Sequence, residues 1–339
     1  MNWNEFNRAL DSGDIAPVYL FTGTEEYLKR EALSRLRGKL LPPGLEALND
    51  MTLEGATAQQ ITDAAETMPM MCERRIVTVR DWAPLLSARS RNEDAEVEWM
   101  RRWLDNPPVT CVLVFYMRGN PDGKKKLTAL LKKQAAVVDF QPLSDAELAR
   151  WCRGQLKPSG KKLSTGTLNT LSFMAGRELT RLTGELEKLV AYVGERDEIT
   201  EADVRAIVPA SLEYKVFEIM NQLLEGDMLK AQQTVNSLLQ GGQSPMGLLA
   251  MLTRQARQLT HMRCALDAGN SVQQVQAQLD MHAYAAKQTA RQCARLSACW
   301  LKDLYDACVE SDYAVKSGRL RDQDALNALL FRIGLAEKR

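Results

Sequence analysis

The sequence predicts an α/β domain built on a mostly parallel sheet, followed by two all-helical domains. Through residues 1–141, short apolar segments typical of buried strands alternate with helical segments, as in parallel sheets covered on both faces. Helical patterns dominate from residue 142 onwards. A chain of 339 residues is also long enough for two or three domains. We therefore expect domains at 1–141, 142–210 and 211–339.

In the first domain, strand and helix signals follow one another along the chain. The apolar run at residues 17–21 leads to Gly23, as a buried strand leads into a turn. A helix with leucines at helical spacing is expected from Glu25 to about Leu40. The motif Thr57-x-x-Gln60 is a capping box that opens another helix. Further strands are expected at residues 75–79, 110–116 and 136–140.

The second domain is expected to be a small helical module. It opens at a second capping box, Ser144-x-x-Glu147. Residues 163–194 have the pattern of two helices broken near Gly176, and residues 199–203 look like another helix start. A domain boundary is expected at residues 209–211.

The third domain is expected to be a helical bundle. Ser244 is a cap residue before Pro245, which suits the first helical position. The long helix that follows has an apolar face at helical spacing. Further apolar stripes are found in residues 216–224, 296–315 and 326–333.

Composition excludes several classes of protein. The 44 Lys and Arg residues balance 43 Asp and Glu residues, so no strong net field attracts nucleic acid or an anionic membrane. Apolar residues make up 45% and charged residues 26%, as in ordinary globular proteins. No uncharged stretch approaches the ~18 residues of a membrane span, and the N-terminus lacks a secretion-type apolar run. We expect a soluble cytoplasmic protein without a membrane partner.

Cysteine and histidine usage argues against metal and hydrolase sites. The seven cysteines form no C-x-x-C pair, and the only histidines are His261 and His282. Zinc sites need such ligands clustered at short spacing, so we expect no metal and reduced, packed thiols. The scarcity of histidine also disfavours Ser-His or Cys-His catalysis, and no catalytic residue is assigned. His261 is expected at the surface or its boundary.

The turn after the first strand lacks the main features of a nucleotide site. A P-loop cradles phosphates with two glycines and a Lys-Ser/Thr pair. Here Gly23 is followed by neither the second glycine nor that pair. Glu25 and Glu26 stand in the first helical turn, where they would repel a triphosphate. We interpret Thr24 as the helix cap and expect no cofactor.

Several segments together resemble a known family. They are residues 18–28 (VYLFTGTEEYL), 66–77 (ETMPMMCERRIV), 216–227 (VFEIMNQLLEGD) and 243–257, with a weaker likeness at 312–318. In this order they resemble the delta subunit family of the bacterial DNA polymerase III clamp loader. The resemblance implies a degenerate AAA+ fold: a RecA-like domain, a helical lid domain and a helical collar domain. The related ATPase subunits carry a P-loop and a zinc-binding cysteine cluster, both missing here.

Three methionines form the most informative segment. Met68, Met70 and Met71 surround Pro69, which breaks the preceding helix, so an elbow between helix and strand is expected. From the residues alone, such methionines most often fill gaps in a core. The resemblance implies instead that Met70 and Met71 enter a hydrophobic pocket of the sliding clamp, with Met68 as a further candidate. Relatives often carry leucine or aromatic residues there, so the two methionines are a departure.

Two basic groups are candidates for DNA contact. Lys124, Lys125 and Lys126 are followed on the same helix by Lys132 and Lys133; either this is a solvated face or it contacts phosphates. Near the end of the chain, Tyr313 could stack on a base beside the positive charge of Lys316, Arg319 and Arg321.

The function expected is that of a non-catalytic clamp-loader subunit that binds the clamp and helps to open it for loading on primed DNA. Its implied partners are the sliding clamp (beta), the ATPase subunits and delta prime of the loader, and primer–template DNA. As a subunit it would belong to a DNA-directed DNA polymerase holoenzyme, a nucleotidyltransferase, without an activity of its own. Two alternatives stay open: an active AAA+ ATPase with a cryptic nucleotide site, and an unrelated cytoplasmic helical scaffold.

Overall fold

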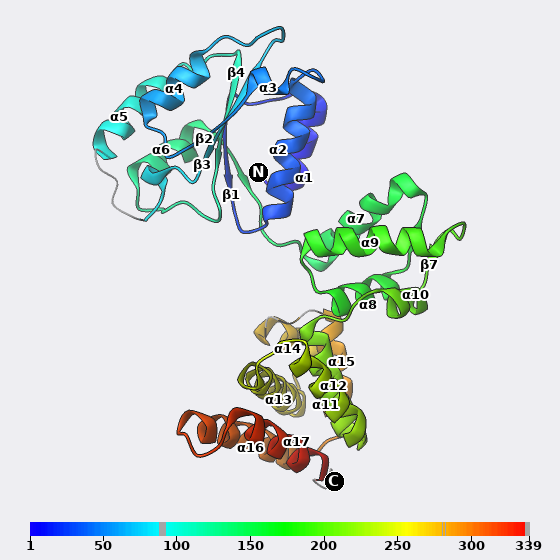
Figure 1. Cartoon of the computed structure of the whole chain (residues 1–339). Helices are drawn as coiled ribbons and strands as arrows, with labels where there is room; N and C mark the ends of the chain where they lie inside the picture. The colour runs from blue at the N-terminus through cyan, green and yellow to red at the C-terminus, as the bar shows by residue number, and fades with distance from the viewer. Residues whose placement is uncertain (88–92, 280, 282, 336–339) are drawn as a thin grey trace. The chain divides into compact units, whose positions relative to one another are not determined.

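The computed structural model describes residues 1–87, 93–279, 281 and 283–335 (Figure 1). Contacts within the chain divide it into two compact units, Met1–Leu143 and Ser144–Arg339. The first unit is α/β and the second is almost wholly helical, as the sequence predicts. The division into three domains stays a prediction, because these contacts place no boundary near residue 210.

A five-stranded parallel sheet forms the centre of the first unit. Its strand order is β2-β3-β4-β1-β5, with residues such as Val18 and Leu113, or Ile76 and Val112, side by side. The strands are β1 (Val18–Thr22), β2 (Asp50–Glu54), β3 (Arg75–Arg80), β4 (Cys111–Tyr116) and β5 (Ala136–Asp139). The four strands predicted from sequence are confirmed, and β2 is an additional strand at the edge.

Helices cover both faces of this sheet (Figure 1). On one face lie α4 (Ala58–Glu66), α5 (Glu93–Leu104) and α6 (Lys126–Gln134). On the other lie α1 (Trp3–Ser12) and α2 (Glu26–Leu40). Both interfaces are apolar: Ile61 and Trp82 belong to the core of the first, and the rings of Phe6 and Phe21 meet at 5.6 Å in the second. The unit is completed by α3 (Glu46–Asn49) and the 3-10 turn η1 (Ala83–Leu85).

Helix caps agree with the sequence at one position and differ at another. Thr57 and Gln60 form the reciprocal capping box expected for α4. The interpretation of Thr24 as the cap of α2 is wrong: Glu25 is the cap, and its Oε1 accepts from the backbone N–H of Tyr27 at 3.2 Å. The backbone of Glu25 lies outside the helical region, as is usual for a cap residue.

The second unit begins with a small group of helices. Ser144 and Glu147 form the expected capping box, and the expected break at Gly176 separates two helices. Two short parallel strands, β6 and β7, were not expected. The elements are α7 (Asp145–Leu156), η2 (Lys157–Ser159), β6 (Lys162–Leu163), α8 (Thr165–Ala175), α9 (Leu179–Val193), β7 (Glu198–Ile199) and α10 (Glu201–Ile207).

The rest of the second unit consists of helices around one apolar core. Ser244 caps α13 with Pro245 in its first turn, as predicted. The helices are α11 (Leu212–Glu225), α12 (Met228–Gln240), α13 (Pro245–Asp267), α14 (Val272–Leu279), α15 (Ala283–Cys293), α16 (Ala298–Lys316) and α17 (Asp322–Leu335). Nowhere in the described part of the chain does a helix combine the length and the apolar content that a membrane span requires.

Candidate functional site

The segment from Thr67 to Arg74, which we call the elbow, connects α4 to β3. Its three methionines face solvent: Met68 is 68% exposed, Met70 54% and Met71 83%. The predicted position between helix and strand is confirmed, and the interpretation of Met68, Met70 and Met71 as core fillers is wrong. Exposed apolar side chains gathered in so short a segment are typical of a protein-binding surface.

The backbone of the elbow keeps Met71 in an unusual conformation. Its φ is +58°, in the left-handed region, which among the described non-glycine residues only Asp81 shares. For an L-residue this region costs about 1–2 kcal/mol relative to the right-handed one, whereas glycine adopts it freely. A long apolar side chain at such a position, 83% exposed, contributes nothing to the core. Strain of this kind is characteristic of functional segments.

The backbone of the turn between β1 and α2 differs from that of a P-loop. A Cβ on Gly23 would lie 2.2 Å from the carbonyl oxygen of Phe140. The backbone at Gly23 is therefore in close contact with the backbone at Phe140. Phe140 O also accepts from the N–H of Glu25 at 3.0 Å, and the N–H of Gly23 donates to Gly119 O at 3.0 Å. These backbone N–H groups, which a P-loop would offer to phosphate, therefore bond within the chain.

Although the Lys-Ser/Thr pair is missing, Lys29 does occupy the P-loop lysine position, and to regard that lysine as absent is wrong. It stands six residues after Gly23, which is the P-loop spacing. The side chain is completely buried, and its Nζ donates to Gly23 O at 2.9 Å and Met117 O at 2.6 Å. It also forms an ion pair with Glu26. The ammonium group is thus neutralised by this chain's own carboxylate.

Tyr116 extends this network. Its hydroxyl donates to Glu26 Oε2 at 2.9 Å, and its ring lies 5.3 Å from Lys29 Nζ. Burial raises the pKa of the Tyr116 hydroxyl, and the bond to the Glu26 carboxylate raises it further. The phenol therefore stays protonated as a donor at neutral pH. The basic and acidic groups of this turn stabilise one another.

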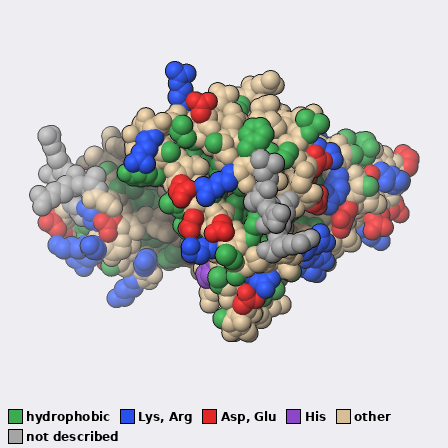
Figure 2. All heavy atoms as spheres, turned by 90° about the horizontal axis from the view of Figure 1, so that it is seen from below, with side chains coloured by type: hydrophobic (Ala, Val, Ile, Leu, Met, Phe, Trp, Pro, Cys, Tyr) green, Lys and Arg blue, Asp and Glu red, His purple; other side chains and the backbone are tan. Residues whose placement is uncertain are grey.

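The two basic groups named as DNA candidates lie in different units. On α6 and the loop before it, Lys124 and Lys126 are exposed and Lys125 is half-buried, and Lys126 Nζ pairs with Asp94 at 2.9 Å. On α16, Tyr313 is 58% exposed, and the guanidinium of Arg319 lies 5.2 Å from its ring. Lys316 pairs with Asp312 at 2.7 Å. On the face shown in Figure 2, basic side chains are interspersed with acidic ones.

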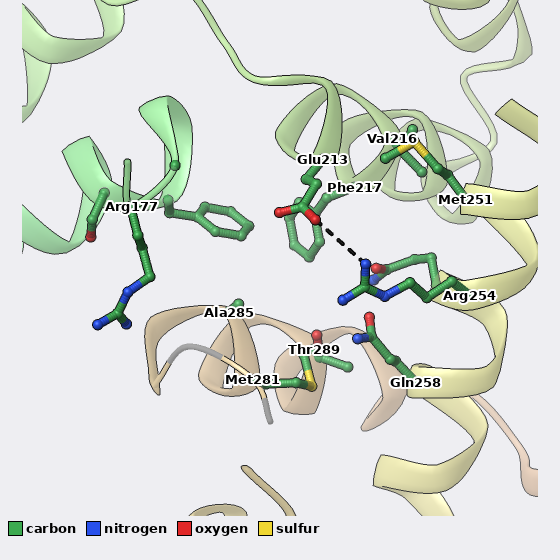
Figure 3. Close-up of a pocket in the computed structure, with 14 residues that line it drawn as sticks. Arg177, Glu213, Val216, Phe217, Met251, Arg254, Gln258, Met281, Ala285 and Thr289 are labelled. Carbon is green, nitrogen blue, oxygen red and sulfur yellow. Dashed lines mark hydrogen bonds and ion pairs between the residues drawn. The ribbon is translucent and has the colours of Figure 1, made fainter. Parts of the chain in front are cut away.

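A cavity of about 290 Å³ lies in the second unit, and nothing in the sequence marked it. Its wall comes from α8, α11, α13 and α15, and includes Phe173, Phe217 and Thr289 (Figure 3). At its rim, Glu213 and Arg254 form an ion pair at 3.5 Å. The lining mixes aromatic, thioether and amide groups without a concentration of charge.

Cysteines and histidines agree in part with expectation. All seven cysteines are free, and four are buried, with burial raising the pKa of Cys111 to about 12. Cys264 and Cys299 are exposed, so the expectation that all the thiols are packed is wrong for these two. His261 is exposed, as expected, and His282 lies outside the described residues. No group of three potential metal ligands occurs among the described residues.

Comparison with known proteins gives consistent matches along the chain. Residues 19–141 match the family model of DNA polymerase III, delta subunit, and residues 213–333 match that of its C-terminal domain. DNA polymerase III subunit delta of Bacillus subtilis is 27% identical over 331 residues, covering 96% of this chain and 95% of the relative. A probable delta subunit of Aquifex aeolicus is 25% identical over 264 residues, covering 75% and 73%.

A solved structure supports the same assignment. The Bacillus subtilis DNA clamp loader delta protein (YqeN) aligns with a TM-score of 0.60 and 25% identity, covering 98% of this chain and all of that chain. Together these matches define the class: a clamp-loader subunit of DNA polymerase III. Within it, the chain belongs to the delta subunit family. The predicted fold class, a RecA-like α/β domain followed by helical domains, is confirmed, and neither the ATPase nor the scaffold alternative is favoured.

Proposed function

We propose that this clamp-loader subunit binds the sliding clamp through the elbow and helps to open it for loading on primed DNA. The observation that carries the proposal is the exposure of Met68, Met70 and Met71 on one short segment. Thioether side chains are flexible and fill irregular apolar pockets well. A few side chains that are buried in pockets near the centre of a protein interface carry most of its binding energy.

Ring opening follows from differential binding. A partner that binds the distorted form of a closed ring more tightly than the intact form shifts the ring towards the open state. The size of the shift is limited by the difference between the two binding free energies. The elbow would supply that difference through apolar contact alone, with no bond made or broken by this chain.

We further propose that the chain has no nucleotide chemistry of its own and that the nucleotidyltransferase activity belongs to the holoenzyme. Lys29 and Glu26 neutralise each other, and the carboxylate of Glu25 caps α2.

Besides the clamp, the proposed partners of this chain are the ATPase subunits and delta prime of the loader, which would bind the helices of residues 211–339. The chain would contact primer–template DNA within the assembled complex. This would take place in the cytoplasm, where bacterial DNA is replicated.

For DNA, the proposed contacts are Lys124, Lys125 and Lys126 on the first unit and Tyr313 with Lys316 on the second. Lysines contact phosphates without reading sequence, and an exposed tyrosine ring offers a stacking surface. Because the net charge is +1, we expect DNA binding to be a shared property of the assembled loader.

The double variant Met70→Ala with Met71→Ala tests clamp binding. If each side chain is an anchor worth about 2 kcal/mol, each truncation alone weakens binding about 30-fold, and the pair removes detectable binding. The measurement is titration of the cognate clamp with the full chain. Val109→Ala, at a position 78% exposed in the same unit, is the matched control and keeps wild-type affinity. Unchanged binding by the double variant contradicts the assignment.

A further inference from the structure

Asn49, the last residue of α3, lies completely buried beside the elbow. Its side-chain Nδ2 donates to Met70 O at 2.9 Å, and its Oδ1 accepts from Met70 N at 2.7 Å. The second Nδ2 hydrogen goes to Leu45 O at 3.1 Å. The amide thus pairs with the peptide groups of Met70 as a neighbouring strand would. An amide matches this pattern because the side chain must donate two hydrogen bonds and accept a third, whereas a hydroxyl has a single hydrogen to donate and a carboxylate has none.

A second buried side chain holds the start of the elbow. Arg75, the first residue of β3, is 7% exposed, and its Nη1 donates to Thr67 O at 3.2 Å. Between these two points the elbow carries no helix or strand. Backbone groups of residues 67 and 70 are therefore fixed from outside the elbow, by side chains of α3 and β3.

Fixing the backbone matters for an anchor made of methionines. Their side chains lose rotamer freedom when they enter a pocket, and a mobile backbone would add its own ordering cost on binding. The bonds of Asn49 to Met70 directly precede Met71, whose φ of +58° an unrestrained chain would rarely hold. Asn49 itself is buried and offers no surface to a partner.

We propose that Asn49 is a positioning residue for clamp binding: its amide holds the backbone of Met70 so that Met70 and Met71 are presented before the clamp arrives. This inference rests on the proposed function of the elbow. Asn49 contributes through the methionines and not through contact with the clamp.

The test uses the full chain with Asn49→Ala and Asn49→Asp. The alanine variant loses all three bonds, and the aspartate variant can accept from Met70 N but sets a carboxylate against Met70 O. Loss of preorganisation is expected to weaken clamp affinity about tenfold in either variant. In a Met71→Ala background, where binding is weakened but measurable, Asn49→Ala should cost markedly less than in the wild type, because one of the positioned anchors is gone.

A direct readout is hydrogen exchange. The Met70 amide should lose protection in Asn49→Ala while the amides of β3, such as Val77, keep theirs. The matched control is Ile61→Val on α4, which removes a buried methyl group from the same unit without touching the elbow. It should lower the melting temperature yet keep wild-type affinity.

Each outcome of these experiments either supports or overturns the inference. The inference is overturned if Asn49→Ala binds like the wild type, if its loss is the same with and without Met71, or if Ile61→Val loses affinity equally. If Met70→Ala with Met71→Ala binds normally, the proposed function of the elbow fails, and the role of Asn49 fails with it. If that double variant loses binding but Asn49→Ala does not, only the role of Asn49 fails.

Discussion

At the residue scale, Lys29 has a structural role in this chain. Its ammonium group satisfies two buried carbonyl oxygens and one carboxylate, linking the end of β1 to the segment after β4. A buried ammonium is tolerated only with such partners. Lys29 therefore stands at the P-loop lysine position, six residues after Gly23, but its ammonium group binds groups of this protein.

Replacing this lysine should destabilise the first unit. In Lys29→Met, the carbonyls of Gly23 and Met117 lose their donor, and we expect a loss of about 2–4 kcal/mol in the free energy of unfolding. The carboxylate adds little, since Glu26 is 44% exposed and can be solvated. Urea unfolding measures the change. Lys39→Met, at an exposed position of the same helix, is the control and should change stability by under about 0.5 kcal/mol.

The position of the elbow could be predicted from the sequence, but the residues that hold its backbone could not. Pro69 marks the helix end, and the family resemblance picks out Met70 and Met71; exposure itself cannot be deduced from apolar side chains that suit a core equally well. Asn49 carries no sequence signal, because it meets Met70 across 21 residues through tertiary contacts. The sequence favours Thr24 as the cap of α2, because threonine is a more common cap residue than glutamate, but the structure has Glu25 there.

At the element scale, the apolar strands at the centre of the sheet could be predicted from the sequence, and the polar or very short strands could not. The strands β1, β3 and β4 are buried along almost their whole length, so they read as apolar runs. The edge strand β2 has no fully buried residue. Its polar residues Asp50, Thr52 and Glu54 interrupt the apolar pattern by which a strand could be predicted. The strands β6 and β7 have two residues each, which is too short for an alternation of apolar and polar residues to be recognised.

The N-terminus of helix α10 has a capping box of Thr200 and Asp203, and the carboxylate of Asp203 can be protonated. Asp203 accepts from Thr200 N at 2.9 Å and pairs with Arg196 at 2.8 Å. The Arg196 guanidinium, and then the bonds from Thr200, hold the pKa of Asp203 well below its ordinary value. A lowered carboxyl pKa stabilises the fold above the unfolded-state pKa of about 3.9, and that stability is lost as the pH falls through the folded-state value.

We therefore expect Asp203→Asn to be less stable than the wild type at neutral pH and the difference to narrow as the pH falls below about 4. Urea midpoints of the two proteins between about pH 7 and pH 3 give the comparison. Asp197→Asn, an exposed position in the preceding turn, serves as the control and should follow the wild type throughout. A gap between Asp203→Asn and wild type that is independent of pH would contradict the argument.

At the scale of the whole molecule, the chain joins an α/β unit to an almost wholly helical unit, and the exposed methionines of the elbow lie on the first. The near balance of acidic and basic residues leaves no strong field to drive association. We therefore propose that the chain acts through local apolar contact with a protein partner. Nothing in that mechanism requires a nucleotide on this chain.

Opening of the clamp by this chain alone, without nucleotide, tests that claim most directly. A cognate clamp labelled with a fluorophore pair across its ring interface reports the separation of the two sides. We predict that the wild-type chain increases the separation without ATP, and that Met70→Ala with Met71→Ala leaves the ring closed. Opening that needs ATP bound to this chain, or that proceeds undiminished with the double variant, would contradict the account.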